Sequence, residues 1–241
     1  MSLFVSNKCI NKLIVSFLRI VLVLCLISYI PITQAKHILV FGDSLSAAYG
    51  IDIDKGWVSL LNEQLDTQRS KNEPVNAEQL SLLENDNLKS NNPNHFQVSN
   101  ASISGETTTG GLARLQVTLN EIKPDIVLLE LGANDGLQGQ PTNKIIENLN
   151  SMIDIIEKHG AQTAIIGVSL PASYGPRYVD QFRSVFPSVA KARQLPFLDL
   201  YREDFYLKQG FMQSDGLHPT ELAQPTIRDI VFEFLLQAKL I

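Results

Sequence analysis

The chain has 241 residues, with 20 lysines and arginines against 25 aspartates and glutamates, a net charge of −5. Hydrophobic residues make up 44% and charged residues 19%, which is typical of a folded domain and argues against intrinsic disorder. Residues 1–35 hold three basic side chains and no acidic one, so the other 206 residues carry 17 basic and 25 acidic side chains. Such an acidic body lacks the basic surface of a nucleic-acid-binding protein.

Both cysteines, Cys9 and Cys25, also lie within residues 1–35. The rest of the chain therefore has no thiol. This excludes a disulfide framework, a cysteine nucleophile and a zinc–thiolate site from that part of the chain.

The N-terminus has the pattern of an export signal. Two lysines precede an apolar run that is interrupted by Arg19 and then continues for 13 residues, fewer than the ~20 that a membrane-spanning helix needs. Thr33 and Ala35 place acceptable residues at the −3 and −1 positions of a cleavage site. We therefore expect a signal peptide over 1–35, cleaved after Ala35, and a periplasmic or secreted domain over 36–241 without stable membrane insertion. An uncleaved membrane anchor is the alternative.

After the signal, apolar segments of two kinds alternate. Five short runs predict strands that are covered on both faces, as in parallel sheets: 37–41, 96–100, 126–131, 164–168 and 197–200. Between or after them, apolar residues recur on one face of a helix over 112–122, 145–156 and 227–235. The alternation predicts one three-layer α/β/α domain with a five-stranded parallel sheet, whose site forms at the carboxyl ends of the strands.

One stretch, 68–94, breaks this alternation because it is polar, rich in asparagine and without a sustained apolar period. Its composition favours a mobile surface insertion, and a functional loop is the alternative.

A candidate nucleophile, Ser44, follows the first predicted strand. Gly42 allows a tight turn there, and a helix beginning after the turn would offer backbone N–H groups to an anion. Taken alone, the Gly-Asp-Ser segment also fits ordinary turn chemistry with a helix cap.

A nucleophilic serine needs a general base, and histidine is the usual one. Of the four histidines, only His218 lies in a loop with a nearby acid, because Asp215 stands three residues earlier and can fix the imidazole tautomer. The segment by itself also fits a plain Asp-Gly turn and helix entry. The remaining histidines open a strand, end the polar stretch and end a helix: His37, His95 and His159.

Acyl transfer also needs donors for the developing oxyanion. Gly105 follows the second predicted strand and offers a backbone N–H, and Asn134 follows the third and offers a side-chain amide. With the Ser44 N–H they would make a three-donor oxyanion hole, although each loop alone also fits turn chemistry. Asp43 and Asp135 stand in the same motifs and are expected to be structural.

These motifs resemble those of the SGNH (GDSL) hydrolases, and most closely those of the bacterial periplasmic group of multifunctional thioesterase I, protease I and lysophospholipase enzymes. The matching segments keep the family's order over nearly all of the chain after the signal: GDSLSAAYG (42–50), NASISGETTTGGLARL (100–115), ELGANDGLQG (130–139), LPASYGPRY (170–178) and YLKQGFMQSDGLHP (206–219).

The resemblance implies a flavodoxin-like fold and an acyl-enzyme formed on Ser44. It implies a small-molecule acyl ester or thioester substrate, lysophospholipid included, and no metal or cofactor. It also places the substrate-binding residues in two segments that flank an acyl pocket: Gly136, Leu137, Pro171 and Tyr174. We expect a monomer.

Three other functions compete with this interpretation. A carbohydrate O-acetyl esterase would share the fold and triad, and a non-catalytic anion-binding module would share the glycine-rich loops. A phosphoryl-transfer enzyme would need a basic residue in its glycine-rich loop, and residues 42–50 contain none.

Overall fold

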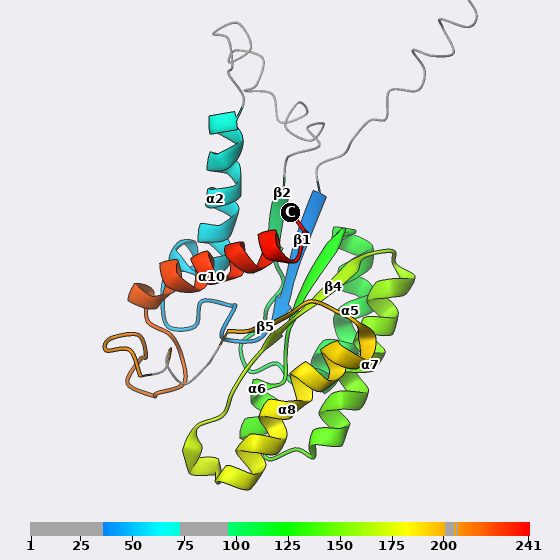
Figure 1. Cartoon of the computed structure of the whole chain (residues 1–241), viewed down its shortest axis with the longest axis vertical. Helices are drawn as coiled ribbons and strands as arrows, with labels where there is room; N and C mark the ends of the chain where they lie inside the picture. The colour runs from blue at the N-terminus through cyan, green and yellow to red at the C-terminus, as the bar shows by residue number, and fades with distance from the viewer. Residues whose placement is uncertain (1–35, 73–95, 201–204, 206) are drawn as a thin grey trace, which may run out of the picture. The chain divides into compact units, whose positions relative to one another are not determined.

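The computed structural model describes residues 36–72, 96–200, 205 and 207–241 (Figure 1). The predicted signal peptide lies outside these residues, as do His95 and most of the predicted polar insertion. Within the described part, no helix is both long and apolar enough to cross a membrane.

A parallel sheet of five strands forms the centre of the domain, in the order β2-β1-β3-β4-β5. This confirms the predicted five-stranded parallel sheet, and the order is that of flavodoxin-like folds. Strand β2 lies on one side of β1, and the later strands β3, β4 and β5 follow on the other side. Folds of this kind bind their ligands at this switch in strand order, between β1 and β3. The strands are β1 (Lys36–Gly42), β2 (Phe96–Asn100), β3 (Ile126–Glu130), β4 (Gln162–Gly167) and β5 (Phe197–Asp199).

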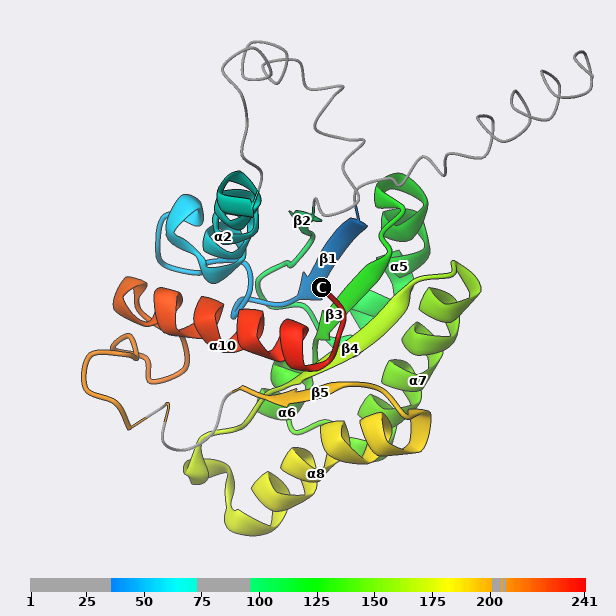
Figure 2. The ribbon, with the colours of Figure 1, turned by 45° about the horizontal axis from the view of Figure 1, so that its top comes forward.

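Helices cover both faces of this sheet and complete the predicted three layers (Figure 2). One face carries α5 (Thr108–Ile122), α7 (Thr142–Lys158) and α8 (Pro176–Arg193), and the other carries α2 (Trp57–Asn72) and α10 (Gln224–Gln237). The short helix α6 (Ala133–Leu137) follows β3. The apolar periodicity of the sequence did not predict helices α2 and α8. The first five residues of the predicted polar insertion belong to α2, and therefore to a helix.

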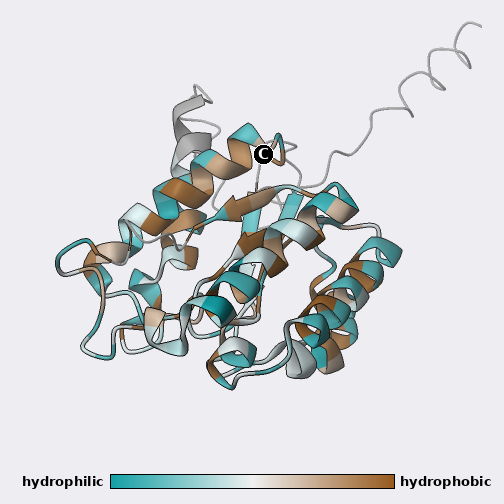
Figure 3. Cartoon of the chain, turned by 60° about the horizontal axis from the view of Figure 1, so that its bottom comes forward, coloured by the Kyte–Doolittle hydropathy of each residue, from teal (hydrophilic) through white to brown (hydrophobic). Residues whose placement is uncertain are grey.

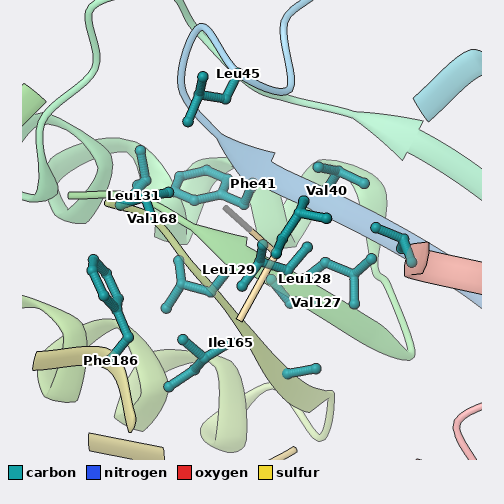
Figure 4. Packing of buried hydrophobic residues seen from close by; sticks show 14 of the residues in the cluster. Val40, Phe41, Leu45, Val127, Leu128, Leu129, Leu131, Ile165, Val168 and Phe186 are labelled. Carbon is teal, nitrogen blue, oxygen red and sulfur yellow. The ribbon is translucent and has the colours of Figure 1, made fainter. Parts of the chain in front are cut away.

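The core explains why the strand sequences are almost continuously apolar. Ile38–Phe41 and Val127–Leu129 are fully buried, because β1 and β3 are central strands with helices on both sides. Figure 4 shows five of these side chains, those of Val40, Phe41 and Val127–Leu129, together with Phe186 of α8. In Figure 3 the hydrophobic colour gathers in the strands, whereas the outer helices mix hydrophobic and hydrophilic residues.

Helix α5 holds the loop that precedes it at the carboxyl edge of the sheet. The Thr107 hydroxyl caps the helix by accepting a hydrogen bond from the Gly110 N–H at 3.2 Å. Gly111 lets the helix approach the sheet closely, since a Cβ there would lie 2.5 Å from Leu131 Cδ1. The Thr107 cap and the close packing at Gly111 therefore hold the start of α5, and with it the loop that contains Gly105.

Candidate active site

Ser44 lies two residues beyond the end of β1, at the carboxyl edge of the sheet. The predicted helix after it is absent: residues 44–50 form consecutive turns, and α2 begins only at Trp57. The preceding residue shapes this turn, because the Asp43 carboxylate accepts the Leu45 N–H at 3.0 Å and the Asp43 carbonyl accepts the Ala47 N–H at 3.0 Å.

The sheet edge and a distant loop bring together the three residues of the predicted triad. His218 Nε2 lies 2.9 Å from Ser44 Oγ, and His218 Nδ1 lies 2.7 Å from Asp215 Oδ2. The other oxygen of Asp215 accepts the backbone N–H groups of Leu217 at 2.8 Å and His218 at 3.1 Å. Burial by itself would raise the pKa of Asp215, but these hydrogen bonds outweigh it and lower the pKa to about 2. The Asp215 carboxylate is therefore charged at neutral pH.

Two of the other histidines have partners of their own. His37 Nε2 lies 2.7 Å from Ser99 Oγ, and partial burial lowers the pKa of His37. His159 follows the last residue of α7, where its Nδ1 lies 2.9 Å from the Ile155 carbonyl oxygen. Among the described histidines, His218 is the one that bonds the Ser44 hydroxyl.

Of the two further oxyanion candidates, Asn134 lies beside Ser44 in the wall of one cavity. Its amide donates to Asp43 Oδ2 at 3.3 Å and to the Glu106 carbonyl at 3.0 Å. Gly105 is exposed, has a φ of +83° that favours glycine, and lies outside the lining of this cavity. The structure thus places Asn134 and Ser44 in the wall of the same cavity, whereas Gly105 lies on the adjacent loop, outside that wall.

A pair of buried carboxyl groups lies behind the Ser44 turn. Burial raises the pKa of Asp43 to about 7, and burial together with the nearby Asp43 charge raises the pKa of Glu130 well above its ordinary value. Asp43 accepts hydrogen bonds from Leu45 and Asn134, whereas Glu130 accepts only at Oε2, from Ser46 Oγ at 2.8 Å and from the Asp43 N–H at 3.4 Å. Its Oε1 is buried without a described partner. When the pair ionises, we assign the first negative charge to Asp43, which has the better set of donors, while Glu130 keeps its proton.

The other motif aspartate, Asp135, has a structural role, as predicted. Its carboxylate accepts the backbone N–H and the hydroxyl of Thr108, at 2.7 and 2.6 Å, and so ties α6 to the first turn of α5.

A cavity of about 430 Å³ opens beside Ser44, within the size range of pockets for small molecules. Its wall is mostly apolar and comprises Ser44, Leu45, Ala133, Asn134, Leu137, Ser169, Leu170, Pro171, Ala172, Val179, Arg183, Leu207, Gly216, Leu217 and His218.

Two of the four predicted substrate-binding residues, Leu137 and Pro171, belong to this wall, and two do not. Gly136 is buried in the packing instead: a Cβ there would lie 2.6 Å from Phe182 and 2.8 Å from Leu170. Tyr174 donates its hydroxyl hydrogen to the Leu137 carbonyl at 3.1 Å, and so ties two segments of the cavity's surroundings together.

Three residues of the wall lie outside the motif segments that the sequence indicated: Ser169, Val179 and Arg183. Helix α8 carries Val179 and Arg183 one turn apart. The helical spacing of Phe182, Val185, Phe186 and Val189 would have revealed this helix, and with it the wall.

A flavodoxin-like parallel sheet with a hydrogen-bonded Ser, His and Asp at its carboxyl edge defines an SGNH-type hydrolase scaffold. The model of the GDSL-like Lipase/Acylhydrolase family matches residues 40–224, and the chain belongs to this family.

Individual relatives agree with this assignment. The chain is 38% identical over 201 residues to Esterase TesA of Pseudomonas aeruginosa strain PAO1, covering 83% of this chain and 88% of that protein. It is 35% identical over 195 residues to Thioesterase 1/protease 1/lysophospholipase L1 of Escherichia coli strain K12, covering 81% of each. A solved structure of the psychrotrophic esterase EstA from Pseudoalteromonas sp., inhibited by monoethylphosphonate, matches with a TM-score of 0.70 at 36% identity, over 84% of this chain and 97% of that one.

Proposed function

We propose that the protein is a serine hydrolase that cleaves carboxylic esters and thioesters of acyl chains and acts in the periplasm or outside the cell after loss of residues 1–35. The observation that carries this proposal is the unbroken line of hydrogen bonds from Asp215 through His218 to Ser44 at the wall of an apolar cavity. Relatives that match most of the chain bear the names esterase and thioesterase.

In the proposed mechanism, His218 accepts the hydroxyl proton of Ser44 as Oγ attacks the acyl carbonyl carbon. The carbonyl oxygen becomes an oxyanion, and Asp215 stabilises the imidazolium that forms. When the tetrahedral intermediate collapses, the bond to the alcohol or thiol breaks and His218 returns the proton to that leaving group. Water then attacks the acyl-enzyme by the same steps, which releases the carboxylic acid and restores Ser44.

For the oxyanion we propose the donors that the sequence indicates: the Ser44 N–H, the Gly105 N–H and the Asn134 amide. The Asn134 amide is the best supported of the two added donors, because it shares the cavity wall with Ser44. Gly105 would contribute from the neighbouring loop.

The size and chemistry of the cavity favour acyl chains longer than acetyl. A space of about 430 Å³ with leucine, proline and valine in its wall suits a hydrocarbon chain better than the acetyl group of a decorated carbohydrate. We propose that Leu137 and Pro171 contact the chain, that Gly136 allows the packing behind it, and that Tyr174 fixes the Leu137 segment. A non-catalytic anion-binding module would not need the hydrogen bonds from Asp215 to His218 and from His218 to Ser44.

The first test is Ser44→Ala, assayed with a chromogenic short-chain ester. We expect turnover to fall to the background of the assay while the circular dichroism spectrum and melting temperature stay those of the wild type, since the substitution removes one oxygen atom. Ser46→Ala is a poor comparison because it breaks a buried hydrogen bond, so Ser184→Ala on the exposed side of α8 serves as the matched control. Full activity in Ser44→Ala would refute the proposed function.

The second test is a profile of kcat/KM over acyl length, using p-nitrophenyl esters, acyl-CoA thioesters and lysophosphatidylcholine. We expect kcat/KM to rise beyond acetyl with chain length in the first two series, because added methylene groups enter the apolar cavity. A maximum at acetyl would favour the carbohydrate O-acetyl esterase instead.

A further inference from the structure

We propose that Gln213 and Tyr49 form a clamp that positions His218 against Ser44, and that both are positioning residues for the reaction. Neither residue belongs to the wall of the cavity, so neither is assigned to the substrate. This inference rests on the proposed function, since it concerns how the general base is held. We call the pair the Gln213–Tyr49 clamp.

Backbone hydrogen bonds close the loop that carries the base. The Gln213 N–H donates to the His218 carbonyl at 2.8 Å, and the Gly216 N–H donates to the Gln213 carbonyl at 2.9 Å. Met212 and Pro219 form an antiparallel bridge just outside. Asp215 and His218 therefore lie in a closed turn whose first residue is Gln213.

The side chain of Gln213 joins this turn to the nucleophile's loop. Its Nε2 donates to the Tyr49 carbonyl at 2.8 Å and to the Pro219 carbonyl at 3.0 Å. One amide group thus uses both of its N–H bonds to link segments 164 residues apart. Gly50 makes room for this contact: its φ is +74°, and a Cβ there would lie 2.6 Å from Gln213 Oε1.

The ring of Tyr49 forms the second part of the clamp. It lies against the imidazole of His218, with 4.3 Å between ring centroids and an angle of 35° between planes. Half of Tyr49 is exposed to solvent, so burial in the core does not account for its placement. The contact covers a face of the imidazole, while its two nitrogen atoms remain bonded to Asp215 and Ser44.

The contacts together fix His218 in every direction that proton transfer requires. Gln213 holds its backbone, Tyr49 its ring plane, and Asp215 the rotation of the ring within that plane. The 2.9 Å bond to Ser44 then needs no rearrangement before the attack. A displacement of about 1 Å at such a distance costs up to a hundredfold in rate.

The test uses the full chain and substitutions that each remove one contact of the clamp. Gln213→Met has the same length without donors, and Tyr49→Leu removes the ring. For both we expect kcat to fall by about tenfold to a hundredfold with KM within about twofold of the wild type, because ground-state binding of substrate is untouched. Tyr49→Phe should restore kcat, since it keeps the ring that lies against His218. Gln181→Met, at an exposed position of α8, is the matched control.

A double-mutant comparison separates positioning from simple loss of structure. In the His218→Ala background there is no base to position, so we expect Gln213→Met and Tyr49→Leu to lower the residual rate no further. Equal losses in both backgrounds, a rise in KM with kcat unchanged, or a Tyr49→Phe variant as slow as Tyr49→Leu would overturn the clamp. If His218→Ala itself retained wild-type turnover, the proposed function would fail first. Melting temperatures of all variants show whether each rate belongs to a folded protein.

Discussion

Asn134 lies between two oxygen acceptors, the Asp43 carboxylate and the Glu106 carbonyl. Both acceptors hold its amide nitrogen at the cavity wall and together take its two N–H bonds. Donation to an oxyanion therefore means exchanging one of these bonds, and the 3.3 Å bond to Asp43 is the longer of the two. Asp43 therefore orients a residue of the proposed site, whereas the sequence predicted only a structural role for it. The sequence places Asp43 next to Ser44, but it carries no signal that the carboxylate turns back toward a residue 91 positions away.

The expected cost of losing this donor is large. Asn134→Ala should lower kcat by about a hundredfold, as for other single oxyanion donors, with a smaller effect on KM. Steady-state rates on a p-nitrophenyl ester measure this directly, and Asn150→Ala on α7 is a control outside the cavity wall. An unchanged kcat would remove Asn134 from the oxyanion hole.

The buried pair of Asp43 and Glu130 makes stability depend on pH in an unusual direction. Both pKa values are raised in the folded state, so between about pH 4 and 7 the folded protein retains protons that the unfolded chain releases. Because the folded state binds more protons, the free energy of unfolding contributed by this pair decreases as the pH rises through that window.

Glu130→Gln tests this linkage, since glutamine keeps the shape and an acceptor for Ser46 but does not titrate. We expect the decrease in unfolding free energy between pH 4 and pH 7 to be smaller in Glu130→Gln than in the wild type. Urea denaturation at pH 4, 5, 6 and 7 measures both slopes, and titrating groups remote from this pair cancel in the comparison. Identical slopes would contradict the raised pKa of Glu130.

At the scale of elements, the regular part of the fold is well predicted by apolar periodicity. The five strands and the helices α5, α7 and α10 coincide with the expected segments to within a few residues. The turn after Ser44 does not follow from local pattern. There, Asp43 bonds the Leu45 N–H, and Ala48 takes a left-handed φ of 58°, a conformation that no propensity of alanine indicates.

Helix α8 contributes one side of the cavity wall. Val179 lies in the cavity wall, one turn before Arg183 on the same helix. Val179→Trp should fill part of the space, so that kcat/KM falls steeply for long acyl chains and little for short ones.

The same series of p-nitrophenyl esters measures this selectivity change. Val117→Trp, at an exposed position of α5, is the matched control and should leave the profile unchanged. A uniform loss over all chain lengths would mean that the acyl chain does not pass Val179.

Over the whole molecule, the topology explains why the motifs meet. Parallel strands end at one edge, and the order β2-β1-β3 sets the segments after β1 and β3 side by side, so the proximity of Ser44 and Asn134 follows from the fold class. The distances themselves do not follow, because they depend on loops. The contact between Gln213 and Tyr49 is one example: both residues stand in predicted motifs, yet only the folded chain shows that they touch.

The position of the cysteines gives a prediction for the whole protein. Residues 36–241 contain no cysteine, so N-ethylmaleimide should leave the esterase rate of the full chain unchanged, whereas a phosphonate ester that reacts with serine should abolish it. Rates before and after each reagent provide the measurement. Inactivation by the thiol reagent would assign a role in activity to residues 1–35.

The direction of α2 has a consequence for how this protein can vary. The helix runs back from the carboxyl edge and ends at Asn72, and β2 starts at Phe96 opposite Lys36, the first residue of β1 (Figure 1). The described residues that flank positions 73–95 therefore lie at the amino edge of the sheet, the edge remote from Ser44. Since the entropic cost of closing a longer connection grows only slowly with its length, we expect this junction to tolerate changes in length. For the same reason, a reporter domain is best inserted between Asn72 and Phe96.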